Sequence, residues 1–290
     1  MAEALYLECE TGISGDMTVA ALLDLGADQE GLQKALATVP ADGFRIHISD
    51  VKKAGLVCKD FDVVLDELHE NHDHDMDYLY GHLSEHGEEE HHHHEEHHHH
   101  EEHHHHEEHH HEHHHTHRGL ADVKEIIEKT EISENAKSIA IKIFEIIARA
   151  EAKAHGEALE NVHFHEVGAI DSIVDVIAIA YCLDNLAEKF HYEKVIVPHL
   201  CEGTGSVRCQ HGILPIPVPA VVNIVCENGI ALKRVNQVGE MVTPTGAAAV
   251  AAIRTDSVLP EVYTIKAVGL GSGKRQYERP SILRAFVISA

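Results

Sequence analysis

The chain has 290 residues, a formal net charge of −26 and a hydrophobic content of 43%. This is enough apolar material for one large domain or two small ones. Because nucleic-acid phosphates are bound by Lys and Arg, the acidic balance argues against a nucleic-acid partner, and it is compatible with attracting metal cations. Aromatic residues make up only 4% of the chain and Trp is absent, so we expect a core of Ala, Val, Ile and Leu.

Two patterns bear on the compartment. No apolar run reaches the roughly 18 residues that a transmembrane helix needs, and residues 1–9 do not resemble a signal peptide. The six cysteines form no C-x-x-C pair, which is typical of free thiols in a reducing compartment. We therefore expect a cytoplasmic protein that has no membrane partner. These cysteines are Cys9, Cys58, Cys182, Cys201, Cys209 and Cys226.

The first zone of the sequence, residues 1–68, is patterned like folded protein. Phe44, Ile46 and Ile48 alternate with polar residues, which predicts a strand with one buried face. We expect a strand, an Ala- and Leu-rich helix and a hairpin in that order. The predicted bounds are a strand at 4–9, a helix at 16–25 that ends before Gly26, and hairpin strands at 44–51 and 56–65.

Residues 69–117 are dominated by His and Glu. Twenty His lie between His86 and His117, and no apolar residue interrupts them. Nothing there can be buried to offset the entropy of ordering, so we expect a disordered loop that interrupts a single domain spanning residues 1–290. Neutral imidazoles suit Ni²⁺, Cu²⁺ and Zn²⁺ and predict many loose, exchanging sites, although a solvated loop without function is the alternative. The predicted ligands are His91, His92, His93, His94, His97, His98, His99, His100, His103, His104, His105 and His106.

The third zone, from residue 118 onward, mixes helices and strands. Ser133 is a good N-cap, Ile residues follow at helical spacing, and Gly156 is a good stop. With the first zone, these elements predict an α/β (or α+β) fold in which helices pack on a mixed sheet. The predicted elements are a helix between the cap Ser133 and the stop Gly156, helices at 170–186, 219–226 and 245–253, strands at 194–197, 262–268 and 282–288, and a flexible loop at 269–275.

Two motifs place metal-binding or acidic side chains at regular spacing. His163 and His165 lie two residues apart, so in an extended segment they share one face; Glu166 follows directly. Asp171 and Asp175 lie four apart, which stacks them on one face of an apolar helix. Buried carboxylates are costly unless they are paired or bind a ligand. The alternatives are core hydrogen bonds for the histidines and capping or salt bridges for the aspartates.

Three further motifs are rich in glycine, proline and hydroxyl groups. A turn between strand and helix at 12–16 directs backbone N–H groups at a helix start, which favours an anion. The segment 203–217 predicts a shaped loop with His211 near its centre, and 243–246 offers a helix start with hydroxyls. Each of these could equally be an ordinary turn. The binding residues predicted from them are Gly12, Ser14, Gly15, Asp16, Gly203, Gly205, Thr243 and Thr245.

Five motifs in this order resemble the nickel-insertion proteins that complete the nickel-pincer cofactor in lactate racemase maturation. The His-rich insertion between the first and second motifs also matches, and the resemblance covers nearly the whole chain. The motifs are GISGDM at 12–17, HFHEVGAIDSIVD at 163–175, the G-x-G-x-V segment with its HG-x-LP-x-P continuation at 203–217, TPTGAAA at 243–249 and GLGSG at 269–273.

The resemblance implies a CTP-dependent cyclometallation. Nickel is inserted into pyridinium-3,5-bisthiocarboxylic acid mononucleotide, with formation of nickel–carbon and nickel–sulfur bonds. It further implies that CTP and Mn²⁺ or Mg²⁺ act through a C-terminal part that this chain lacks. We therefore expect a separately encoded C-terminal half, apo lactate racemase or a homologue as recipient of the cofactor, and compatibility with a homo-oligomer.

By motif position, the resemblance makes His163, His165 and Glu166 the first candidates for contact with nickel or substrate. His211 is a candidate acid, base or ligand, and Asp171 and Asp175 are candidate metal ligands. His and carboxylate ligands exchange readily, which suits a metal ion that must be transferred to the sulfur and carbon atoms of the substrate. The competing hypothesis is a nickel storage or delivery protein that acts only through its His-rich loop.

Overall fold

The computed structural model describes residues 3–66, 79, 118–164, 169–209 and 211–290. The predicted disordered insertion at 69–117, with its histidine ligands, therefore lies outside the described residues, Leu79 excepted. His165 and Glu166 also lie outside them, and of His163 only the backbone is described.

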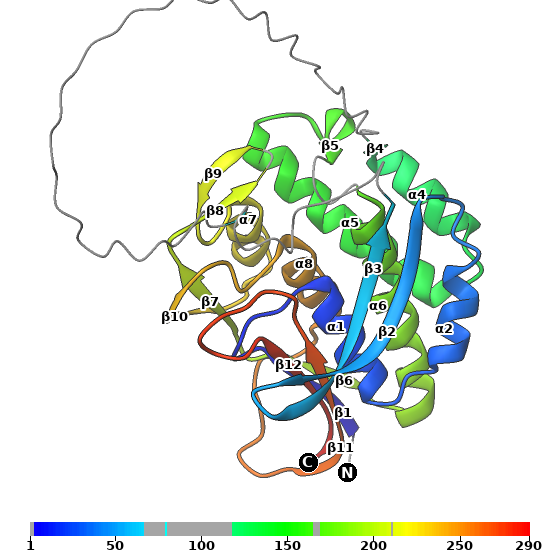
Figure 1. Cartoon of the computed structure of the whole chain (residues 1–290), viewed down its shortest axis with the longest axis vertical. Helices are drawn as coiled ribbons and strands as arrows, with labels where there is room; N and C mark the ends of the chain where they lie inside the picture. Colours follow the sequence, from blue (N-terminus) through cyan, green and yellow to red (C-terminus); the bar gives the residue numbers. More distant parts are fainter. Residues whose placement is uncertain (1–2, 67–78, 80–117, 165–168, 210) are drawn as a thin grey trace, which may run out of the picture.

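A mixed sheet of six strands forms one layer, in the order β2-β3-β11-β12-β1-β6. Most neighbours are antiparallel, whereas β3 pairs with β11 and β1 pairs with β6 in parallel. The pairing of β1 with β12 brings the two ends of the chain together (Figure 1). The predicted mixed sheet is thus confirmed. Its strands are β1 (Glu3–Glu8), β2 (Phe44–Lys53), β3 (Leu56–Leu65), β6 (Lys194–Ile196), β11 (Thr264–Ser272) and β12 (Ile282–Ser289).

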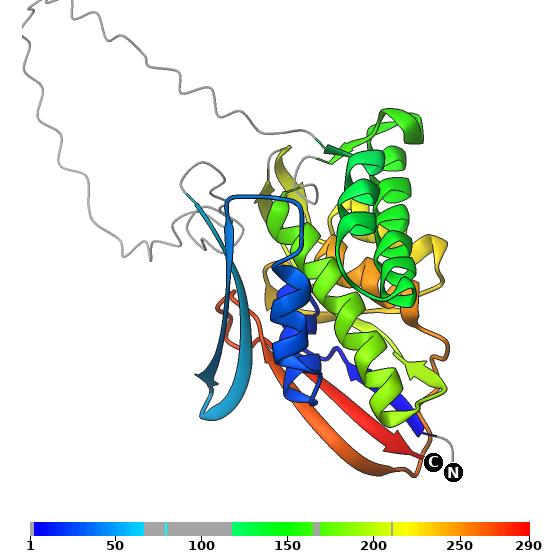
Figure 2. The same cartoon turned by 90° about the vertical axis from the view of Figure 1, so that its right-hand side faces the viewer.

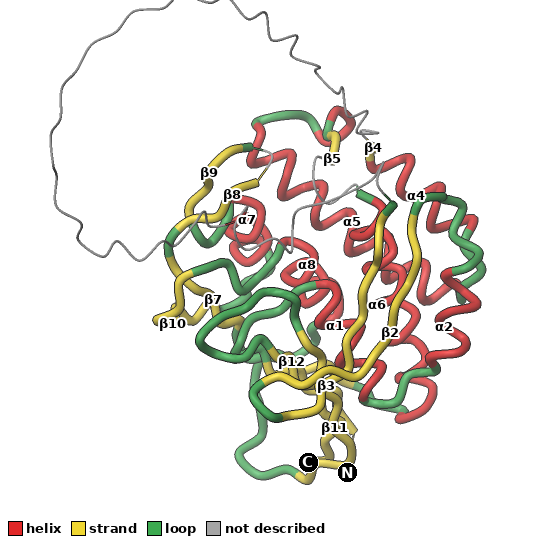
Figure 3. Tube along the Cα trace, in the orientation of Figure 1, coloured by secondary structure: helices red, strands yellow, loops and turns green. Residues whose placement is uncertain are grey.

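Helices form a second layer beside this sheet (Figures 2 and 3). The cap at Ser133, which accepts a hydrogen bond from the N–H of Ala136, and the left-handed Gly156 bound α5 as predicted. Helix α1 lies between the sheet and α6, and it contacts β3 and β11 on one side. The helices are α1 (Gly15–Asp24), α2 (Gln29–Leu36), α4 (Leu120–Lys129), α5 (Glu134–His155), α6 (Ile170–Phe190), α7 (Pro219–Glu227) and α8 (Pro244–Ile253), with the short turn η1 (Leu159–Asn161).

Small strand pairs complete the described fold. Parallel β7 (Leu200–Thr204) and β10 (Leu232–Val238) lie near the end of β1, and the hairpin of β8 (Ser206–Cys209) and β9 (Gly212–Pro215) projects beside α7. The third pair is β4 (Arg118–Gly119) with β5 (His163–Phe164). The segment 203–217, predicted to be a shaped loop, is thus mostly strand, and His211 lies at the tip of a hairpin.

One prediction is wrong: residues 269–272 are the end of strand β11 and not a flexible loop. The glycines that suggested a loop serve close packing instead. A Cβ built on Gly269 would stand 2.2 Å from the carbonyl oxygen of Ala21, and one on Gly271 would stand 2.1 Å from that of Met17. Glycine is thus needed because helix α1 presses its backbone onto the strand.

The main core is aliphatic, as the composition predicts. Its buried members are almost all Ala, Val, Ile and Leu, and Phe61, Phe144 and Phe164 are the aromatic residues buried in it within the described ranges. All six cysteines are free thiols. No described helix is both long enough and apolar enough to cross a membrane.

Candidate functional site

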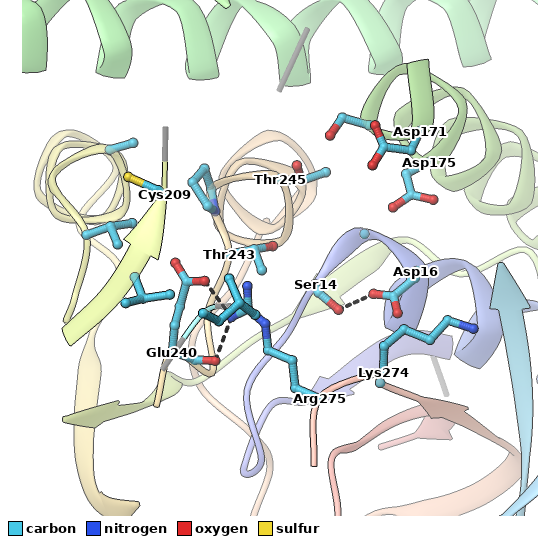
Figure 4. A pocket seen from close by; sticks show the side chains of 18 of the residues that line it. Ser14, Asp16, Asp171, Asp175, Cys209, Glu240, Thr243, Thr245, Lys274 and Arg275 are labelled. Atoms are coloured by element: carbon cyan, nitrogen blue, oxygen red, sulfur yellow. Dashed lines mark hydrogen bonds and ion pairs between the residues drawn. The ribbon is translucent and has the colours of Figure 1, made fainter. Parts of the chain in front are cut away.

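A cavity of about 370 Å³ opens where the N-terminal ends of α1, α6 and α8 converge. The β8–β9 hairpin, the end of α5 and the loop after β11 complete its wall. Figure 4 shows Asp171 and Asp175 of α6 directed toward Asp16, with Thr243 and Thr245 between this acidic side and Cys209. Segments from every part of the described chain therefore meet at one place.

The turn before α1 is locked against the start of α8. Gly12 has a φ of +90°, and a Cβ there would stand 2.0 Å from the carbonyl oxygen of Met241. The N–H of Ile13 donates to Met241 at 2.9 Å, and the N–H of Thr243 donates back to Ile13 at 3.1 Å. These contacts set the N-terminal ends of α1 and α8 beside each other, with both positive helix ends at the cavity.

Three carboxylates form the acidic side of the cavity. Asp16 is 9% exposed, and its Oδ1 accepts a hydrogen bond from the Ser14 hydroxyl. Its Oδ2 and the Oδ1 of Asp175 are buried and find no hydrogen-bond partner in the described part of the chain. Burial, followed by the charges of Asp16 and Asp171, raises the pKa of Asp175 well above its usual range. Asp175 is therefore suited to accept and hold a proton.

Two cations border the cavity and are held by acidic partners. Lys274 Nζ lies 2.7 Å from Asp60 Oδ2 and 3.4 Å from Asp62 Oδ1. Burial lowers the pKa of Lys274, but the hydrogen bond and the charges of these carboxylates outweigh it and raise the pKa above its ordinary value. Arg275 donates to both the carboxylate and the backbone carbonyl of Glu240. Their charge lies at the rim of a site that a negatively charged molecule could enter.

Imidazole and thiol groups form the opposite side. The rings of His155 and His211 lie 4.8 Å apart, and Cys209 Sγ lies 3.9 Å from His211 Nδ1. His155 Nε2 lies 3.2 Å from a carboxylate oxygen of Glu151. Burial, followed by the charge of His155, lowers the pKa of His211, which favours the neutral imidazole that binds metals.

Most of the predicted site residues that lie in the described part of the chain meet at this cavity. Gly12 lies behind the cavity wall. Gly203 and Gly205 are absent from the lining, and a Cβ on Gly203 would stand 2.0 Å from the carbonyl oxygen of Gly239, so its glycine serves the contact between β7 and β10. The predicted residues that line the cavity are Ser14, Gly15, Asp16, Asp171, Asp175, His211, Thr243 and Thr245.

Sequence reasoning missed part of the lining. Glu151 and His155 stand four residues apart on α5, a spacing that puts both on one face, but nothing in the sequence links them to His211. From the sequence, Cys209 is only one of six cysteines expected to be free thiols. Glu240 and Tyr277 also line the cavity, and the Tyr277 hydroxyl donates to the Glu240 carbonyl.

Comparison with known proteins decides the family. The family model described as "Nickel insertion protein" matches residues 5–290. The chain belongs to the nickel insertion protein family. No solved structure matches it, so the cavity described above is not read from a relative of known structure.

Curated members of the nickel insertion protein family extend beyond the matched region. The relative from Alkaliphilus metalliredigens is 48% identical and that from Clostridium acetobutylicum 42%, over 99% and 98% of this chain. The one from Acetivibrio thermocellus is 37% identical over 99%. All three are named pyridinium-3,5-bisthiocarboxylic acid mononucleotide nickel insertion protein. The chain spans 60–63% of their lengths.

Proposed function

We propose that the cavity is the place where Ni²⁺ is inserted into pyridinium-3,5-bisthiocarboxylic acid mononucleotide. The observation that carries the proposal is the make-up of the cavity wall, which combines a carboxylate cluster on α1 and α6 with an imidazole and thiol cluster on α5 and the β8–β9 hairpin. The family match and the names of the curated relatives supply the metal and the substrate class.

Nickel is a substrate in this proposal. His155, His211 and Cys209 hold the incoming ion, since neutral imidazole and sulfur are suitable ligands for Ni²⁺ and leave when better ligands arrive. The two sulfurs of the substrate then replace them, and a ring carbon gives up its proton as the nickel–carbon bond forms. Asp175 accepts that proton because its raised pKa favours the protonated carboxyl. The ligand roles predicted for His163, His165, Asp171 and Asp175, and the predicted part of Glu166, remain predictions.

The mononucleotide phosphate binds at the start of α8 in this proposal. The Thr243 side chain already accepts the N–H of Gly246 at 3.2 Å, and Thr245 lines the cavity. The N-terminal end of a helix favours an anion, and Lys274 and Arg275 add positive charge at the rim. Ser14 and Gly15 at the neighbouring start of α1 offer a second such end.

The remaining parts of the reaction are proposed from the resemblance. CTP and Mn²⁺ or Mg²⁺ act through a C-terminal part, which belongs either to the same polypeptide or to a separately encoded half. Apo lactate racemase or a homologue receives the cofactor. The activity is a cyclometallation, and we place it in the cytoplasm, with a homo-oligomer as a compatible assembly.

The test combines binding with turnover. Calorimetric titration of the untagged chain with the pyridinium substrate, and mass spectrometry of the product after addition of Ni²⁺, CTP, Mg²⁺ and the C-terminal part, are compared for Asp175→Asn and Asp184→Asn. Both lie on α6, but Asp184 bonds Ser133 and Asn135 outside the cavity. We expect the Asp175 variant to bind substrate without metallating it and the Asp184 variant to resemble the parent. Absence of substrate binding to the parent chain would refute the site.

Nickel storage is a second candidate, favoured by the twenty His between His86 and His117. Deletion of residues 88–115 separates the two. If the fold inserts nickel, the deleted protein metallates substrate at ample Ni²⁺ and slows only when Ni²⁺ is scarce. Loss of metallation at every nickel concentration, with His155→Ala and His211→Ala fully active, would favour storage and delivery.

A further inference from the structure

Glu10, His199 and Cys201 form a cluster outside the cavity. One ligand atom from each lies within 4.8 Å of the others, and among the described residues this is the one group of three His, Cys, Asp or Glu side chains gathered so closely. Glu10 lies in the turn after β1, whereas His199 and Cys201 lie two residues apart at the start of β7. The approach of Glu10 to the other two therefore depends on the fold.

The distances within the cluster are close to those of a metal site. Glu10 Oε1 lies 2.8 Å from His199 Nε2, and Glu10 Oε2 lies 3.3 Å from Cys201 Sγ. Ligand atoms at normal bond lengths around a tetrahedral Zn²⁺ are roughly 3.5 Å apart. Side-chain adjustments on the order of an ångström would place one ion between the three groups.

The surroundings leave the cluster open on one side. The Cys201 side chain is buried against Val235 and Met241, whereas the side chains of His199 and Glu10 are 31% and 45% exposed. An ion can therefore enter from solvent and keep a free coordination position, as in sites that exchange their ligand.

A neighbouring lysine supports the carboxylate. Lys233 Nζ lies 2.8 Å from Glu10 Oε2, and Cys201 pairs with Lys233 across β7 and β10. Lys233 holds one carboxylate oxygen and leaves the other beside His199, the outer contact that ligating carboxylates commonly have.

We propose that Glu10, His199 and Cys201 form a second metal site, for one divalent transition-metal ion of intermediate softness such as Ni²⁺, Co²⁺ or Zn²⁺. Thiolate, imidazole and carboxylate together suit these ions and not Mg²⁺ or Ca²⁺. Binding replaces the thiol proton of Cys201 with the metal and releases that proton to solvent, so the two negative ligands neutralise the ion. Cys201 packs against Met241, which lines the cavity, so the site lies directly behind the cavity wall.

Co²⁺ titration of the whole chain tests this site, because a Co²⁺–thiolate bond gives a near-ultraviolet charge-transfer band that His and Glu ligands do not give. The background carries Cys209→Ser and Cys226→Ser, which removes the other cysteines that are not buried. We expect the intensity of the band at saturation to correspond to one Co²⁺–thiolate bond per chain, since Co²⁺ held by the His-rich segment gives no such band. Addition of Cys201→Ser should abolish it, and His199→Ala should weaken Co²⁺ binding by roughly tenfold or more.

Two results would overturn the site. One is the absence of a thiolate band in the background protein, which would leave Glu10 as the centre of an ion-pair cluster only. The other is a band that persists in the Cys201→Ser variant. If Cys201→Ser does not fold by circular dichroism, the half-exposed His199→Ala variant decides through its Co²⁺ affinity. Cys209→Ser removes one of the proposed nickel ligands of the cavity, so metallation is measured with Cys209 in place, on Cys201→Ser and His199→Ala alone, and neither of these two residues lines the cavity. Failure of this site would therefore leave the proposed insertion function standing, and the reverse also holds.

Discussion

The backbone of Gly15 lies directly against the carboxylate of Asp175: a Cβ built on Gly15 would stand 2.3 Å from Asp175 Oδ2. Gly15 is the first residue of α1 and does not need the left-handed region. The requirement for glycine is therefore one of space. It lets α6 bring Asp175 up to the start of α1, where the carboxylate of Asp16 already lies.

Gly15→Ala should move the Asp175 carboxylate and lower metallation by on the order of 100-fold, because small misplacements at a reacting centre have effects of that size. The free energy of unfolding tests the contact between residue 15 and Asp175 more directly than metallation does. We expect Gly15→Ala to destabilise the parent and to have a much smaller effect in an Asp175→Ala background, where the nearest atom to the new Cβ is the residue 175 Cβ, at 3.0 Å. Equal effects in both backgrounds in a urea-unfolding cycle would contradict this contact.

Asp175→Asn should stabilise the fold while it removes activity. The pKa of Asp175 is raised in the folded protein, so above the ordinary aspartate pKa the folded state binds more protons than the unfolded state, and stability falls as pH rises. The asparagine has no such charge to bury. The Asp175→Asn variant should thus unfold at nearly the same temperature as the parent at pH 4, and at an increasingly higher temperature than the parent toward pH 8. Asp184→Asn is the control. If the difference in stability between Asp175→Asn and the parent were the same at all pH values, the pKa of Asp175 would not be raised by burial and by the neighbouring carboxylates.

Gly12→Ala should destabilise the protein by more than about 3 kcal/mol, since it adds a positive-φ penalty to a backbone clash with Met241. Gly156→Ala is the matched control. Gly156 also has a positive φ, of +69°, but a Cβ there meets nothing within 4 Å, and we expect a cost of about 1 kcal/mol. Urea unfolding measures both, and similar losses would show that the contact between the α1 and α8 starts contributes little.

Local signals explain why some elements were predictable and others were not. Helix α5 is bounded by a Ser cap and a left-handed glycine that act within a few residues, so the sequence alone shows its ends. The end of β11 was misread because Gly269 and Gly271 favour a loop locally, and only the approach of α1 makes them necessary in a strand.

The site residues also divide into those that a local sequence pattern predicts and those that it does not. The spacing of Asp171 and Asp175 predicts a shared face on α6, which the structure confirms. The contact of His155 with His211, and the approach of Glu10 to His199 and Cys201, join segments far apart in the chain, and no local pattern predicts these contacts. Such groups become visible only when the tertiary fold is known.

Glu202 provides a second pH-dependent prediction, outside the cavity. It is 2% exposed, and its Oε1 accepts the N–H groups of Gly203 and Met241, each at 2.8 Å. Burial raises its pKa to about 7 even though these bonds lower it. Between the ordinary value of 4.5 and about 7 the folded state binds the extra proton, so its contribution to stability declines as pH rises through that window.

Glu202→Gln keeps an oxygen acceptor for the backbone donors and removes the charge. The stability of this variant relative to the parent should therefore rise between pH 5 and pH 8, by about 3 kcal/mol at most, the equivalent of the pKa shift. Urea unfolding at several pH values measures the difference, with the exposed Glu261→Gln as control. A flat difference would mean that Glu202 is ionised in the folded protein at pH 5, and that its three backbone hydrogen bonds outweigh its burial.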